Sequence, residues 1–127
     1  MKHAFFLLLT ASILSGCKEL GLKDENFTHQ VKDVNANDVF VIQSKGIANT
    51  SVHFTVEGSL SHDARIIWSD QEITADTVVA SYPTEILLPK GQVNVTTYGD
   101  FYSKKLYVRY ESLNDSTSGN LEIKIKL

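Results

Sequence analysis

Leu121-Glu122-Ile123-Lys124-Ile125-Lys126-Leu127 alternates strictly between apolar and charged residues. Side chains of a β-strand point alternately to opposite faces, so this period of two is the pattern of a strand. The segment predicts a strand with one face buried and the other in water. Its inward set is Leu121, Ile123, Ile125 and Leu127, and its outward set is Glu122, Lys124 and Lys126.

The same period recurs through most of the chain from Asp38 onward. Val39-Phe40-Val41-Ile42 is apolar on both sides, which predicts a strand covered on both faces. Gly58 and the Ser61-His62-Asp63 segment are expected to form a loop, and Pro89-Lys90-Gly91 a turn. No segment has the spacing and caps of an amphipathic helix. The remaining predicted strands are centred on 52–56, 66–68, 77–82, 85–88, 93–97 and 106–110.

These segments predict an all-β fold, a seven- to eight-stranded antiparallel β-sandwich, with a small β-barrel as the alternative. Leu88-Pro89-Lys90-Gly91-Gln92-Val93 resembles the corner that leads into the sixth strand of immunoglobulin-like and fibronectin type III domains. Trp68 falls on about the third strand, as a core tryptophan does in those domains. Val93 stands where a corner tyrosine is expected, and the chain has no cysteine pair. The resemblance implies an immunoglobulin-like sandwich and no particular function.

The N-terminal residues have the pattern of an export signal. Met1-Lys2-His3 precedes an apolar run from Ala4 to Leu14, which is too short to span a bilayer, since spanning takes roughly 20 residues. The run ends at Leu14-Ser15-Gly16-Cys17, which resembles the lipobox of bacterial lipoproteins. The alternative is an ordinary secretory signal with a cysteine near its cleavage site.

The lipoprotein resemblance implies that residues 1–16 are removed and that Cys17 carries covalent lipid. Several acyl chains hold a protein stably on a bilayer, whereas one does not. Cys17 is the only cysteine, and modification is the simplest fate for a lone thiol in an exported chain. Lys18, rather than Asp, follows Cys17, which implies outer-membrane sorting if the host is Gram-negative. No other cofactor is expected.

Residues 17–37 are polar with isolated apolar positions, and we predict a lipidated N-terminus and flexible tether there. The sandwich is then expected over residues 38–127. The alternative is that Phe27 and Val31 dock on the domain as the lead-in to a strand. A net charge of −3 at pH 7 argues against a nucleic-acid partner.

No group of residues has the pattern of a catalytic or metal site. Ser61-His62-Asp63 contains the residue types of a hydrolytic triad, but three successive loop residues rarely converge. His53 and His62 show no metal-ligand spacing, and the acidic loop residues Asp70, Glu72 and Asp76 lack the calcium-loop pattern. We therefore predict neither catalytic residues nor metal ligands.

The best candidate for a partner surface is the segment from Tyr98 to Lys105. Aromatic rings bury much area at little entropic cost, and they are enriched where proteins meet. The alternative is that Phe101 and Tyr102 cap the open end of the sandwich. The predicted surface consists of Tyr98, Phe101, Tyr102, Lys104 and Lys105.

The sequence thus predicts a non-enzymatic, membrane-anchored lipoprotein of the bacterial cell envelope. Its β-sandwich is expected to bind a protein or another envelope component, and its oligomeric state is left open. The first alternative is an inhibitor or immunity lipoprotein that neutralises a toxin or hydrolase. The second is a small hydrolase acting on cell-wall or lipid material.

Overall fold

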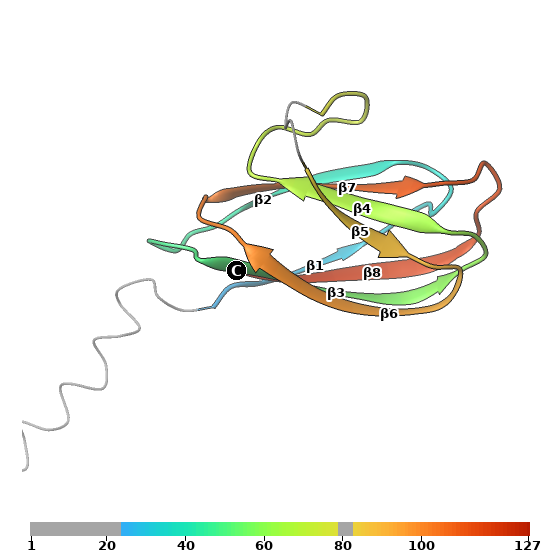
Figure 1. The fold of residues 1–127 in the computed structure, drawn as a ribbon, viewed down its shortest axis with the longest axis horizontal. Coiled ribbons are helices and arrows are strands. Elements are labelled where there is room, and N and C mark those ends of the chain that lie inside the picture. The colour runs from blue at the N-terminus through green and yellow to red at the C-terminus, as the bar shows by residue number, and fades with distance from the viewer. Residues whose placement is uncertain (1–23, 79–82) are drawn as a thin grey trace, which may run out of the picture.

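The computed structural model describes residues 24–78 and 83–127, which form eight antiparallel strands in two four-stranded sheets (Figure 1). No helix occurs in these two ranges. The predicted all-β sandwich is confirmed, and the sheets do not close into the alternative barrel. The strands are β1 (Asn26–Gln30), β2 (Asp38–Gln43), β3 (Ser51–Leu60), β4 (Ala64–Ser69), β5 (Thr84–Leu88), β6 (Gly91–Asp100), β7 (Lys105–Ser112) and β8 (Gly119–Lys126).

Sheet A has the order β1-β8-β3-β6 and sheet B the order β2-β7-β4-β5. The strands pair antiparallel from the two ends of the chain inward: β1 with β8, β2 with β7, β3 with β6 and β4 with β5. A long hairpin rolled up in this way is the jelly-roll form of the sandwich. Figure 1 shows the two sheets as separate layers.

The resemblance to immunoglobulin-like domains does not extend to the strand order. In that fold the first two strands are neighbours in one sheet, whereas here β1 and β2 lie in different sheets. The corner at Pro89-Lys90-Gly91 does join β5 to β6, as predicted, and it carries the chain from sheet B to sheet A. The resemblance covers about ten residues at one corner, which is too few to predict which sheet each strand joins.

The core lies between the sheets and follows the predicted alternation. Val52, Phe54 and Val56 of β3 are fully buried, and the inward residues of β7 and β8 are at most 3% exposed. Trp68 is 7% exposed and packs against Phe54, with ring centroids 5.7 Å apart. Burying each such side chain contributes roughly 1.5–3 kcal/mol, so the alternating positions supply most of the driving force.

The predicted flexible tether is wrong for residues 26–37. Asn26–Gln30 is strand β1, which pairs with β8 along its whole length, and Val31 and Val34 are 4% and 5% exposed. The alternative, in which Phe27 and Val31 dock on the domain, describes this segment. Main-chain hydrogen bonds to β8 offset the entropy of ordering a segment whose own apolar content is low. Residues 17–23 lie outside the described residues.

Three other local predictions also need correction. Val41 lies on the outer face of edge strand β2 and is 49% exposed, so this strand is not covered on both faces. Gly58 belongs to β3 rather than to a loop, because β3 continues alongside β8 as far as Leu60. Of the strand predicted at 77–82, Val78 forms an isolated bridge with Ile73, and residues 79–82 are not described.

Candidate binding surface

The structure divides the predicted partner surface into three parts. Tyr98 lies on the outer face of sheet A and is 77% exposed, whereas Phe101 is buried at 3%. Tyr102, Lys104 and Lys105 are exposed at the end of the sandwich where β6 passes to β7. The prediction is therefore wrong for Phe101 and splits the other four residues between two surfaces. The lipobox residues Leu14, Ser15, Gly16 and Cys17 lie outside the described residues.

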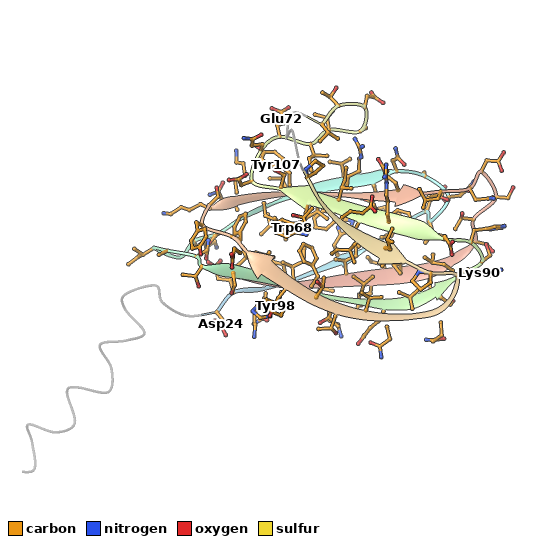
Figure 2. All side chains as sticks on the ribbon, in the orientation of Figure 1. Asp24, Trp68, Glu72, Lys90, Tyr98 and Tyr107 are labelled. Carbon is orange, nitrogen blue, oxygen red and sulfur yellow. The ribbon has the colours of Figure 1, made fainter. Side chains whose placement is uncertain are left out.

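Phe101 is a core residue because it closes one end of the space between the sheets. Its ring packs edge-on against Trp68 with centroids 6.4 Å apart, and its backbone amide donates to the carbonyl of Thr50 at 3.1 Å. Trp68 lies between the two sheets and Tyr98 lies outside them (Figure 2). The capping alternative is correct for Phe101, but Tyr102 is 75% exposed and points into solvent.

Tyr98 belongs to the outer face of sheet A, which we call the open face. The pairing register places one residue from each strand in a row across this face, in the order Asn26, Lys126, His53 and Tyr98. The Tyr98 ring stacks on His53 with centroids 5.7 Å apart, and His53 Nε2 lies 3.4 Å from Ser51 Oγ. The stacking holds the tyrosine ring in one orientation while leaving it accessible.

A second row lies beside the first and is rich in threonine. Between the rows is a hollow of about 380 Å³. Lys124 Nζ at its margin lies 3.3 Å from Glu57 Oε2 and 3.5 Å from Glu122 Oε1, and the Glu57 hydrogen bond and charge raise the pKa of Lys124. The second row consists of Thr28, Lys124, Thr55 and Thr96.

The centre of the outer face of sheet B, in contrast, is covered by the chain itself. The segment after β4 folds back over it, and Ile67 of β4 and Ile73 of that segment are only 4% and 2% exposed. Arg109 Nη1 donates to the carbonyl of Thr74 at 2.7 Å, which fastens the segment to β7. Figure 1 shows this segment above sheet B, and no segment of the described residues covers the outer face of sheet A in the same way.

An ion network beneath this cover explains why charged residues are buried there. Glu111 is 8% exposed and accepts hydrogen bonds from Arg65 and Arg109, and Arg65 Nη1 also contacts Glu85 Oε2 at 2.9 Å. Burial alone would raise the pKa of Glu111, but the two guanidinium groups outweigh it and the pKa is lowered. The network is structural, because its charged groups pair with one another; among the buried side-chain nitrogen and oxygen atoms of the described residues, only Arg109 Nε lacks a hydrogen-bond partner.

Other concave sites lie at the ends and edges of the sandwich. A groove of about 410 Å³ runs between β1 and β2, where His29 stacks on Phe40 at 3.9 Å and its Nε2 lies 3.0 Å from Asp38 Oδ1. These contacts join the two sheets at one edge. A cleft of about 240 Å³ has Asp70, Asp100 and Tyr102 among its lining residues.

The Ser61-His62-Asp63 segment does not form a catalytic triad. Ser61 Oγ lies 2.9 Å from His62 Nδ1, but the Asp63 carboxylate accepts a hydrogen bond from the backbone amide of Lys90 at 2.8 Å. Asp63 therefore fixes the β5–β6 turn rather than orienting the imidazole. Residues 24–78 and 83–127 contain no group of three His, Cys, Asp or Glu side chains that could hold a metal ion. Within the same ranges no helix is long and apolar enough to cross a membrane.

Comparisons with known proteins give likenesses of fold alone. No protein-family model and no curated protein matches the chain. An exo-β-1,3-galactanase from Phanerochaete chrysosporium is similar over 83% of this chain and 27% of its own, with 8% identity and a TM-score of 0.40. The Tobacco streak virus coat protein is similar over 84% of this chain and 88% of its own, with 14% identity and a TM-score of 0.34. Neither likeness supports a functional assignment.

The open face contains residues that sequence reasoning missed. The sequence places Thr55, Thr96 and His53 on separate predicted strands and Thr28 in the predicted tether, and His53 is considered there only as a metal ligand. Strand alternation indicates that such residues face water, but it does not say which of them are neighbours. The pairing register supplies that information.

Proposed function

We propose that this protein is a non-enzymatic, lipid-anchored lipoprotein that binds a protein or another envelope component through the open face of sheet A. One observation carries the proposal: within residues 24–78 and 83–127, a segment of the chain covers the outer face of sheet B, whereas no segment covers the outer face of sheet A. On that bare face Tyr98 is 77% exposed and is held by stacking on His53.

The chemistry of the open face suits recognition. Tyr98 offers a large, rigid surface that loses little entropy on binding, because its ring is already positioned. The threonine hydroxyls of the second row and the ammonium of Lys126 offer hydrogen bonds on a backbone that the sheet holds in place. An exposed aromatic residue surrounded by polar groups is the arrangement of an interface centre with a polar rim.

The anchor in this proposal is the lipidated sulfur of Cys17. It places the protein in the bacterial cell envelope, and on the outer membrane if the host is Gram-negative, because Lys18 follows the cysteine. Palmitate supplied to growing cells should label the full chain and should not label a Cys17→Ala variant. An unlabelled wild-type chain, or a Cys17→Ala variant that still fractionates with membranes, would contradict the anchor.

The binding surface is tested by placing a photo-crosslinking amino acid at position 98 of the full chain in its host. Position 87 is the matched control, because Leu87 is 64% exposed on an edge strand of sheet B. We expect one discrete adduct from position 98 and none of the same mass from position 87. Adducts from neither position, or the same adduct from both, would refute the open face as the binding surface. An adduct with a toxin or hydrolase would favour the inhibitor alternative.

A further inference from the structure

The chain enters the sandwich at an end where three segments are hydrogen-bonded together. The Glu25 carboxylate accepts hydrogen bonds from Ser44 Oγ at 2.7 Å, from the amide of Lys45 at 3.0 Å and from the amide of Gly46 at 2.8 Å. These hydrogen bonds, that from the Ser44 hydroxyl above all, lower the pKa of Glu25 and so favour the ionised carboxylate that accepts them. Residues 24–25 are thereby attached to the β2–β3 loop.

The β2–β3 loop is in turn attached to the β6–β7 loop. The amide of Ser44 donates to the carbonyl of Lys104 at 2.7 Å, and Asn49 Nδ2 donates to the carbonyl of Ser103 at 2.8 Å. We call the surface formed by residues 24–25, 44–50 and 101–105 the entry end. Asp24 marks it in Figure 2, and Lys90 marks the opposite end of the sandwich.

The entry end exposes apolar and cationic side chains together. Ile47 is 62% exposed and Tyr102 is 75% exposed, each at the tip of its loop. Lys45 on the first loop and Lys104 and Lys105 at the second are exposed as well. Tyrosine and lysine next to an apolar side chain are the residue types that settle at a membrane interface, where each finds both its apolar and its polar surroundings.

The opposite end has a different character. Its loops are joined by hydrogen bonds from the amide of Ser61 to the carbonyl of Ser118 and from the amide of Leu113 to the carbonyl of Asp63. The exposed side chains of the β7–β8 loop there are polar or acidic apart from Leu113, and Asp115 and Ser116 form its tip. In the part of the chain that the structure describes, only the entry end therefore combines an exposed aromatic ring with several lysines.

Chain length restricts how far the entry end can lie from a bilayer. Seven residues lie between Cys17 and Glu25, and the eight residue-to-residue steps from one to the other span at most about 29 Å in any conformation. A tether reaching to residue 37 would have let the whole domain stand clear of the lipid. Because the sandwich begins at β1, the entry end is held within reach of the headgroups.

We propose that the entry end docks on the bilayer, with Ile47 and Tyr102 inserted at the headgroup level and the three lysines against anionic lipid phosphates. This inference rests on the proposed lipidation of Cys17. Asp24, Asp70 and Asp100 also lie at this end, so the apolar side chains provide most of the contact and the lysines orient it. The strands run from the entry end to the opposite end, so docking leaves the open face accessible from the side.

The test uses the full lipidated chain in vesicles of phosphatidylethanolamine and phosphatidylglycerol that contain a spin-labelled lipid. Cys17 is blocked by its lipid, so one added cysteine can be given a fluorophore: Ile47→Cys at the entry end, or Asp115→Cys at the opposite end as control. We expect the lipid to quench the label at position 47 at least about threefold more than the label at position 115, because an interfacial residue lies within the headgroup region.

The outcomes separate the two proposals. Protein that floats with the vesicles but shows equal quenching at both positions would overturn docking and leave the lipid anchor standing. Protein that does not float would overturn the anchor and, with it, docking. A Tyr102→Asp substitution should lower the quenching at position 47, whereas Leu113→Asp at the opposite end should not. Equal effects of these two substitutions would also count against docking.

Discussion

Truncating Phe101 distinguishes a core residue from a binding residue. Phe101 is 3% exposed and packs edge-on against Trp68, so Phe101→Ala would leave a cavity beside the indole. Phenylalanine-to-alanine changes in cores cost about 3–5 kcal/mol, and we expect about 3 kcal/mol here because the site lies at the end of the core. Tyr102→Ala removes a ring that is 75% exposed and should change the free energy of unfolding by less than about 0.5 kcal/mol.

The measurement is urea unfolding of the full chain carrying Cys17→Ala, followed by the fluorescence of Trp68, the only tryptophan. With an m-value of about 1.5 kcal/mol/M, a loss of about 3 kcal/mol lowers the midpoint by about 2 M. Phe101→Leu keeps most of the volume and should cost less than about 1.5 kcal/mol. Equal midpoints for Phe101→Ala and Tyr102→Ala would refute the placement of Phe101 in the core.

Three further predictions concern the backbone and buried polar groups. Gly58 and Gly91 both have positive φ, but a Cβ at Gly58 would lie 2.1 Å from the carbonyl oxygen of Asn120, whereas a Cβ at Gly91 would meet nothing within 4 Å. Gly58→Ala should therefore lower the melting temperature much more than Gly91→Ala does. The pKa of Glu111 is lowered from 4.5, so its ion network stabilises the fold above pH 4.5, and this stabilisation is lost as the pH falls below that value. In Glu111→Gln the free energy of unfolding should therefore fall less with decreasing pH than it does in the wild type. Tyr110 Oη donates to the carbonyl of Val34 at 2.7 Å, and Tyr110→Phe should cost about 1–3 kcal/mol in urea unfolding because that carbonyl loses its partner. Burial raises the pKa of Tyr110 from 10.0 to about 12, so its stabilising effect is complete below pH 10 and is lost as the pH rises to about 12. If Tyr110→Phe lost as much free energy of unfolding between pH 10 and 12 as the wild type does, Tyr110 would not be the group responsible.

The candidate site could be predicted only in part. Tyr98 was found from its residue type and from its place on an alternating strand, and it lies on the surface. Phe101 has the same aromatic signal but lies in the core, because the loop after β6 turns inward over the end of the sandwich. Composition does not distinguish an aromatic residue that caps a core from one that faces a partner. His53 was missed because its role is to stack on Tyr98, with which it is paired on the adjacent strand β6.

Local sequence patterns were enough to predict the alternating faces of β3, β7 and β8, the turn at Pro89-Lys90-Gly91 and the all-β class, because each depends on residues close along the chain. The folded structure was needed to place β1 in sheet A and to pair the strands in jelly-roll order. It was also needed to show that one outer face is covered while no described segment covers the other. Those outcomes depend on main-chain hydrogen bonds and on contacts such as that of Arg109 with Thr74, between residues far apart in sequence. Local periodicity carries no information about such partners.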